Sequence, residues 1–148
     1  RLDSLKLMPY VHQGYVGRFQ SVDDYYHRSM DLLDPAVRAD LFNPQRPIRT
    51  KDQSNPSTYY GPDSSCVCSL VADGCIIEGE VENCVLFRGV KVSKGAKVKN
   101  CVLMQGTTVE PGVTLDYIVT DKNVTITADK HLRGNESFPV YVEKNTVV

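Results

Sequence analysis

Three histidines offer this sequence its best general base, because an imidazole titrates near neutral pH. They are His12, His27 and His131, and His27 falls on the polar side of a predicted helix, where we expect it to be solvated. No glycine-rich phosphate loop, Ser/His/Asp set or pair of carboxylates with a plausible pocket accompanies them. The residues alone therefore predict no catalytic, cofactor-binding or metal-ligand residues in this chain.

Five cysteines offer a second kind of chemistry. Cys84 and Cys101 occupy equivalent positions of a repeat described below, so we expect them to stack, with Cys66 and Cys68 nearby. Paired thiols could bind a metal or form a disulfide, whereas a small apolar side chain would simply fill a narrow interior site. No Cys-x-x-Cys or histidine spacing indicates zinc. The second interpretation is favoured, together with a reducing, cytoplasmic location.

A group of basic residues could face a phosphorylated effector or a neighbouring subunit: Arg88, Lys91, Lys94, Lys97 and Lys99. More commonly, such charges keep an outer surface soluble. The 17 basic and 18 acidic residues balance, so the composition does not indicate nucleic-acid binding. No apolar run approaches the ~18 residues of a membrane span, and no signal peptide is evident. The start at Arg1, without Met, suggests a fragment of a longer protein.

The element that must position these residues is a repeat of 17 residues. Residues 81–89 align with residues 98–106, and eight of the 17 aligned pairs are identical, which is too many for chance. Within it a shorter step recurs, from an aliphatic residue through Gly or Asn to the next aliphatic residue. Three such steps make one triangular coil of a parallel β-helix, with Gly or Asn at corners where φ is positive. The register predicts about four coils over residues 66–131.

The inward side chains follow from the same register: Leu86, Val90, Val92, Ala96, Val98, Cys101 and Leu103. In the next repeat Asn123 and Asp129 replace corner glycines, and these residue types tolerate positive φ best after Gly. The predicted fold class is therefore mainly β, a parallel β-helix of hexapeptide repeats preceded by a small α/β remnant and a Pro-rich linker.

The rest of the chain divides into three parts. Residues 1–42 contain an alternating segment read as one or two strands, a helix capped by Ser21 that runs to about Leu33, and a second helix opened by Asp34-Pro35. The apolar stripe of the first helix predicts packing. Residues 43–65 are rich in Pro, Ser and Asn and predict an extended linker. Residues 132–148 predict short strands that cover the open end of the coils.

The order of these parts carries a family resemblance. The motif Gly-Tyr-x-x-x-Phe-x-Ser-Val-x-x-Tyr-Tyr, a Met-Asp-Leu-Leu helix end, the linker and the coils resemble the C-terminal part of bacterial glucose-1-phosphate adenylyltransferase, and in detail a GlgD-type subunit. The matching stretches are residues 76–83, 85–90, 121–122 and 139–144. The resemblance covers essentially the whole chain. It implies a left-handed β-helix, tetramers formed partly through this domain, a preceding nucleotidyltransferase domain and Mg²⁺ in the full enzyme.

One landmark of that family is altered. Catalytic members carry Tyr-Trp-x-Asp-Val-Gly-Thr before this helix, and the resemblance implies that its Asp helps to hold Mg²⁺. Residues 15–21 align with it, and Arg18 stands at the Asp position with Gln20 at the Gly position. A cation cannot ligate a metal ion and would repel it. Arg18 therefore marks a degenerate metal-site position, unless it is an ordinary surface residue and the Asp is replaced from elsewhere.

The expected function is the assembly and regulatory part of a GlgD-type subunit, not catalytic itself. The parent reaction converts ATP and glucose 1-phosphate to ADP-glucose and pyrophosphate in glycogen biosynthesis. Expected partners are a catalytic GlgC-type subunit, further copies of the chain and a small phosphorylated effector, with no nucleic acid and no membrane. Two alternatives stay open. One is a hexapeptide-repeat acyltransferase with His131 as general base, and the other a scaffold subunit of another sugar-phosphate nucleotidyltransferase.

Overall fold

The computed structural model describes residues 6–51 and 53–148. Two α-helices and a 3-10 turn come first: α1 (Val22–Met30), η2 (Asp31–Leu33) and α2 (Pro35–Leu41). Both predicted caps are formed, because Ser21 accepts a hydrogen bond from the Asp24 backbone N–H and Asp34 accepts one from that of Ala36. The helices therefore begin where the sequence predicts.

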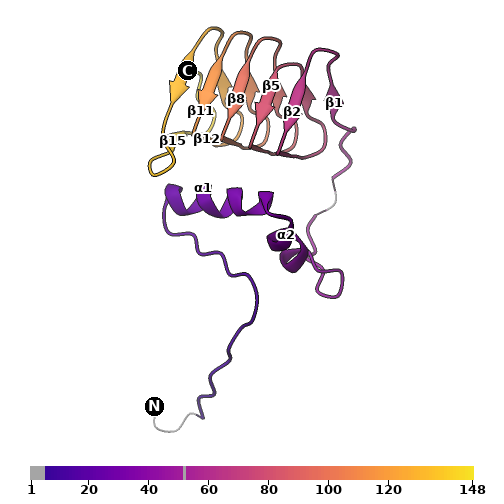
Figure 1. The fold of residues 1–148 in the computed structure, drawn as a ribbon, viewed down its shortest axis with the longest axis vertical. Coiled ribbons are helices and arrows are strands. Elements are labelled where there is room, and N and C mark those ends of the chain that lie inside the picture. The colour runs from indigo at the N-terminus through magenta and orange to yellow at the C-terminus, as the bar shows by residue number, and fades with distance from the viewer. Residues whose placement is uncertain (1–5, 52) are drawn as a thin grey trace.

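Short strands form three five-stranded parallel sheets, which are the flat walls of a β-helix (Figure 1). Sheet A contains β1 (Tyr59–Tyr60), β4 (Ile76–Ile77), β7 (Lys91–Val92), β10 (Thr108–Val109) and β13 (Thr125–Ile126). Sheet B contains β2 (Ser65–Val67), β5 (Glu80–Glu82), β8 (Lys97–Lys99), β11 (Thr114–Asp116) and β14 (His131–Arg133). Sheet C contains β3 (Leu70–Val71), β6 (Val85–Leu86), β9 (Val102–Leu103), β12 (Ile118–Thr120) and β15 (Val140–Val142).

The pairing register equals the sequence repeat. Val81 pairs with Val98 and Val98 with Leu115, so each repeat stacks directly on the next. All seven side chains predicted to point inward are at most 1% exposed, and they form one continuous apolar core with their counterparts in other coils. The predicted parallel β-helix of about four coils is confirmed.

The corners confirm the conformation predicted for them. Positive φ occurs at Gly89, Gly95, Gly106 and Gly112, and also at the corner residues that are not Gly: Asn83, Asn100, Asn123 and Asp129. Tyr117 also has φ of 57°, although a tyrosine side chain disfavours this region. Its ring lies 6.2 Å from the ring of Tyr26, centroid to centroid, so contact with α1 accompanies this strained backbone.

The ends of the β-helix differ from the predicted boundaries. The predicted linker, residues 43–65, is too long, because β1 begins at Tyr59 and already pairs with β4. Residues 132–148 continue the sheets: β15 pairs with β12, and Val147 bridges to Thr125. These additions bring every sheet to five strands. The linker prediction failed because a two-residue strand is too short to show periodicity.

The strands predicted within the first 20 residues are not formed in the part that the structure describes. Residues 6–20 carry no strand, and most of this segment extends away from the helices (Figure 1). The C-terminal part of this segment contacts α2, where the Tyr15 backbone N–H donates to Asp40 Oδ2 at 2.6 Å. That bond holds the pKa of Asp40 below its ordinary value. An alternating pattern gives a strand only beside a pairing neighbour, and residues 6–51 and 53–148 provide none there. Residues 1–5 lie outside the described residues.

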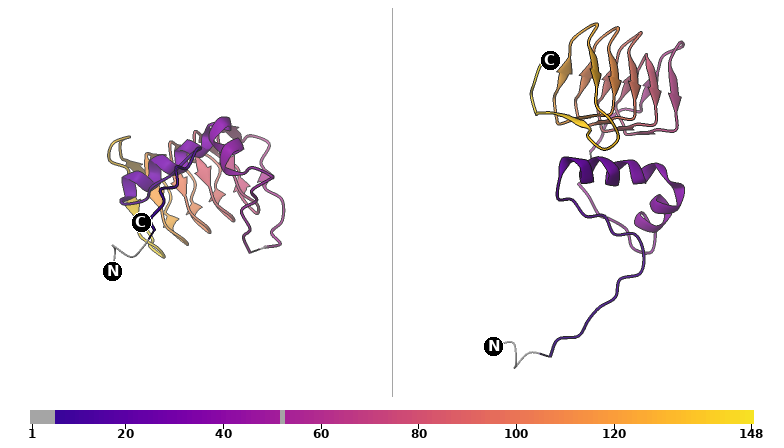
Figure 2. Two further views of the ribbon diagram at one scale, coloured as in Figure 1. Left: turned by 90° about the horizontal axis from the view of Figure 1, so that it is seen from below. Right: turned by 60° about the vertical axis from the view of Figure 1, so that its left-hand side comes forward.

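Helix α1 covers the outer face of sheet C and runs along the stack of coils (Figure 2). Val85, Val102 and Val119 come from three successive coils and are at most 7% exposed beneath it. On the helix side Tyr26 is buried, and Tyr25, Met30 and Leu33 pack around it. The predicted packing role of the apolar stripe is therefore confirmed.

The centre of this contact is polar. Tyr26 Oη donates to the Asn100 carbonyl oxygen at 3.1 Å. Asn100 also links the corners, because its side chain accepts from Asn83 Nδ2 at 2.7 Å and donates to Asp116 Oδ1 at 2.9 Å. Helix α1 is thus fixed to a hydrogen-bonded ladder of corner residues. None of the helices in the described residues is long and apolar enough to cross a membrane.

Candidate functional site

The outer face of sheet B carries the most regular arrangement of charged side chains on the β-helix. Each of its strands has three residues, and the middle one points inward, so the first and third point outward. Stacking turns these outward residues into two parallel rows. We call them the first ridge (Ser65, Glu80, Lys97, Thr114 and His131) and the second ridge (Val67, Glu82, Lys99, Asp116 and Arg133).

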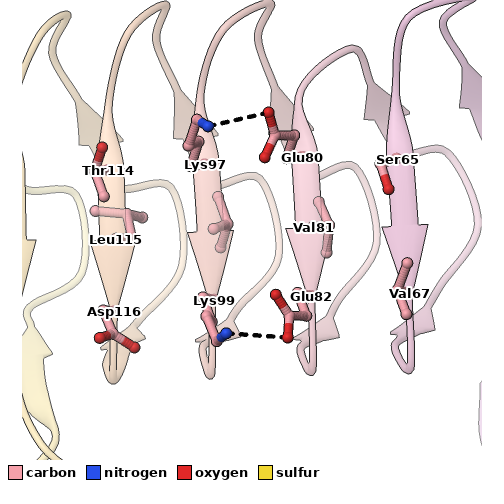
Figure 3. A pocket seen from close by; sticks show the side chains of 11 residues that line it. Ser65, Val67, Glu80, Val81, Glu82, Lys97, Lys99, Thr114, Leu115 and Asp116 are labelled. Carbon is pink, nitrogen blue, oxygen red and sulfur yellow. Dashed lines mark ion pairs between the residues drawn. The ribbon is translucent and has the colours of Figure 1, made fainter.

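Opposite charges lie side by side on β5 and β8 in both ridges (Figure 3). Lys97 Nζ lies 3.2 Å from Glu80 Oε1, and Lys99 Nζ lies 3.0 Å from Glu82 Oε1. The hydrogen bond to Glu82, followed by its charge, raises the pKa of Lys99. These four side chains are 53–62% exposed, so the ion pairs contribute little to stability and remain open to further partners.

A shallow groove of about 330 Å³ separates the ridges. Val81, Val98 and Leu115 lie beneath it, and their side chains point into the core, so the groove floor is main chain. The main-chain hydrogen bonds of the floor are used within the sheet. What the face offers chemically is its alternating charge, which suits recognition of a complementary charged surface.

The five basic residues predicted as an effector or interface site do not form one patch. Lys97 and Lys99 lie on sheet B, whereas Lys91 lies on sheet A and Arg88 lies at a corner between sheets C and A. Lys94 sits at the corner before β8 and pairs with Asp63 at 3.3 Å. Three of the five therefore have carboxylate partners.

Sequence reasoning missed those acidic partners, although the signal was present. Glu82 and Lys99 lie one repeat apart in the sequence, and so do Glu80 and Lys97. Aligned residues of successive coils are neighbours in space. Opposite charges at aligned positions therefore predict ion pairs between strands.

A second, apolar groove of about 360 Å³ lies where α1 begins, beside sheet C. Phe19, Val22 and Tyr25 line one side, and Met104 and Val119 line the other. Tyr141 closes its end. It contains no grouping of acids, bases or nucleophiles that would support a reaction.

The other candidate residues are scattered. Arg18 is exposed in the segment before α1, and His131 is exposed at the start of β14, on the first ridge. His27 Nε2 lies 3.1 Å from Asp23 Oδ1, one helical turn away, and the His27 side chain is 35% exposed, so it is partly buried rather than fully solvated. Within the described ranges, which omit residues 1–5 and 52, no group of three or more His, Cys, Asp and Glu side chains could hold a metal ion.

Cys84 and Cys101 fill interior sites, as favoured from the sequence. All five are free thiols, and Cys84 and Cys101 are completely buried one above the other, with the Cys101 backbone N–H 3.4 Å from Cys84 Sγ. Burial raises the pKa of the Cys101 thiol well above its ordinary value. Such a thiol is a poor nucleophile because the thiolate is the reactive form.

A thiol reagent should therefore distinguish the cysteines of the native protein. We expect Cys68, which is exposed, to react within seconds to minutes with a disulfide reagent, and Cys84 and Cys101 to react only after unfolding. Counting released chromophore before and after adding denaturant measures this. Cys68→Ser should remove the fast phase, and rapid labelling of Cys101 in the folded protein would contradict the buried stack.

Comparisons with known proteins agree with this architecture. Residues 57–137 match the family described as GlmU-like, C-terminal hexapeptide. The chain is 46% identical over 144 residues to the "Glycogen biosynthesis protein GlgD" of Bacillus subtilis (strain 168), which covers 97% of this chain and 42% of that protein. It is 49% identical over 119 residues to the GlgD protein of Geobacillus stearothermophilus, covering 80% of this chain and 35% of that protein.

The chain is also similar to a protein that is named as an enzyme. A "Glucose-1-phosphate adenylyltransferase" of Acetivibrio thermocellus is 39% identical over 89 residues, covering 60% of this chain and 21% of that protein. The chain thus spans less than half the length of each of these three relatives.

Proposed function

Since this chain belongs to the GlmU-like, C-terminal hexapeptide family and is similar to GlgD-type relatives of glucose-1-phosphate adenylyltransferase, we propose that it is the assembly and regulatory part of a GlgD-type subunit. The observation that carries the proposal is the match to GlgD over 97% of the chain, which includes α1 and the segment before it. The coils and the helix packed on them are thus matched as one unit.

The parent reaction converts ATP and glucose 1-phosphate to ADP-glucose and pyrophosphate, in glycogen biosynthesis and in the cytoplasm. The chain itself contributes contacts. A β-helix with a continuous core is a rigid support, and α1 joins it to the preceding segment through Tyr26 and the sheet C valines. Through this connection, a movement of the segment before α1 can shift the β-helix, and a movement of the β-helix can shift that segment.

Catalysis is assigned to a partner, a catalytic GlgC-type subunit. One feature of the sequence supports this division. Arg18 occupies the position where the resemblance places a metal-binding Asp, and a guanidinium cannot ligate Mg²⁺. An effector site is a separate matter: of the five basic residues predicted for one, Lys94, Lys97 and Lys99 have carboxylate partners, and Arg88 and Lys91 have none among the described residues.

Co-expression of the protein with a catalytic GlgC-type subunit tests the proposal. We expect the partner's rate of ADP-glucose formation, or its response to phosphorylated effectors, to change when the protein is present. The protein alone should form ADP-glucose far more slowly than the catalytic subunit does. Turnover by the protein alone at the catalytic subunit's rate, or a partner indifferent to its presence, would contradict it.

A further inference from the structure

Between β5 and β8 the outward charges of sheet B change sign on both ridges, which is the pattern a self-complementary surface requires. Glu80 and Glu82 project from β5, and Lys97 and Lys99 project from β8 at the same heights along the strands. We propose that sheet B binds the sheet B of a second copy of this chain about a two-fold axis that runs parallel to the strands, between β5 and β8. The inference rests on the proposed assembly function and names one of its contacts.

Rotation about that axis sets β5 of one copy against β8 of the other. Glu80 then faces Lys97 of the second copy, Glu82 faces Lys99 of the second copy, and symmetry repeats both contacts. Each ion pair seen within one chain thereby becomes part of a cluster of four alternating charges. A two-fold interface uses the same patch on both subunits, so one patch with both signs is sufficient.

Other two-fold arrangements of the same faces bring like charges together. An axis along the stack of coils reverses the strands and sets Glu80 against Glu82 and Lys97 against Lys99. An axis through β8 sets each lysine against its own copy. Like charges placed opposite one another disfavour association, so the pattern selects both the direction and the register of the contact.

A register shifted by one coil, with the axis between β8 and β11, would use Asp116. That carboxylate is already engaged, because it accepts from Asn100 Nδ2 at 2.9 Å and lies 3.4 Å from Arg133 Nε. Its side chain is only 22% exposed, against 53–62% for the four charges of β5 and β8. The register between β5 and β8 is therefore favoured.

The other two walls are less suited to this contact. Sheet C is covered by α1, and its outward valines are buried. The outer face of sheet A carries Ile76, Lys91 and Thr108 along its middle strands, without alternating charge. Of the three walls, sheet B alone combines exposure with complementary charge over the described strands. Because the charges are exposed, the contact should weaken as ionic strength rises.

A charge-swap experiment tests the contact in the protein as it exists. One variant, E80K/E82K, makes the central patch all positive, and the other, K97E/K99E, makes it all negative. We expect each variant alone to self-associate at least roughly a hundredfold more weakly than the unaltered protein, because every cross-copy pair becomes repulsive. An equimolar mixture should recover association to within about tenfold of the unaltered protein. Sedimentation analysis at low and high salt measures both.

The mixture separates the contact from effects within one chain, because losing the internal pairs cannot be repaired by a second copy. K91E/K122E is the matched control, since it changes the net charge as K97E/K99E does but lies away from sheet B, and its association should stay unchanged. Failure of the mixture to recover, or an unaltered protein that never self-associates, overturns the inference. If the protein still alters a catalytic subunit in either case, the proposed function stands and only this contact fails.

Discussion

Replacing Tyr26 with alanine should release α1 from sheet C while the coils stay folded. Tyr26 is 3% exposed, contacts the layer of Val85, Val102 and Val119, and is hydrogen-bonded to Asn100. Truncating a buried aromatic side chain costs about 3–5 kcal/mol. Here the cost falls on the docking of one helix, because the coils have a separate core of their own.

Hydrogen exchange measures this release directly. A loss of about 3 kcal/mol in local opening corresponds to exchange roughly a hundredfold faster at the α1 amides. The amides of β8 and β11, which lie in the interior of sheet B, should exchange at their original rates. Unchanged exchange in α1 would show that Tyr26 does not hold the helix, and equal acceleration everywhere would show that helix and coils unfold together.

Tyr26→Phe is the matched variant, because it keeps the ring and removes the hydroxyl. We expect a cost of about 1 kcal/mol for the lost bond to the Asn100 carbonyl. It also gives a pH test. Burial raises the pKa of Tyr26 above its ordinary value of 10.0, so the docked helix disfavours the phenolate. Docking is therefore fully stable below about pH 10 and weakens as the pH rises further. Tyr26→Phe should reduce that sensitivity, and burial of Tyr25, which also raises its pKa, accounts for the remainder.

Replacing Gly79 with alanine should destabilise the β-helix as a whole. Gly79 lies in the corner between β4 and β5, which has two residues where the next corner, between β7 and β8, has four. A Cβ at Gly79 would lie 2.4 Å from the Ala96 carbonyl oxygen and 2.7 Å from that of Ser93. Both obstacles are main chain and cannot rotate away. We expect a loss of about 3 kcal/mol in the free energy of unfolding.

Gly61→Ala is the control for Gly79→Ala. Gly61 occupies the equivalent corner of the first coil, and a Cβ there would meet Glu78 at 3.4 Å, which is ordinary contact. Neither glycine has positive φ, so backbone strain does not separate them. We expect Gly61→Ala to be neutral or slightly stabilising through the unfolded state. Equal denaturant midpoints for the two variants would contradict the close packing of the short corner.

The β-helix could be predicted from the sequence because the same residue types recur at each turn of the coil. Gly and Asn mark corners, and aliphatic residues between them mark the interior, so position within a coil follows from counting. The sequence also indicates that the outer face of sheet C is covered. On sheet C both residues of Val85-Leu86 and Val102-Leu103 are apolar, which indicates strands buried on both faces.

Other features needed the coordinates. The function of Gly79 depends on a contact with the following coil, which no local pattern shows. The basic residues could be named from the sequence, but their distribution over two sheets and two corners, and their carboxylate partners, depend on stacking. The prediction of strands before residue 20 failed for a different reason. An alternating pattern shows that a segment can form a strand, but the strand forms only where another strand lies beside it, and residues 6–20 contain none.

The most direct test of the proposed subunit role is the mass of the species formed when the protein is mixed with a catalytic GlgC-type subunit, measured by sedimentation at near-physiological salt. We expect a single faster species that contains both chains. Two species that sediment at their separate rates at every mixing ratio would contradict the assignment.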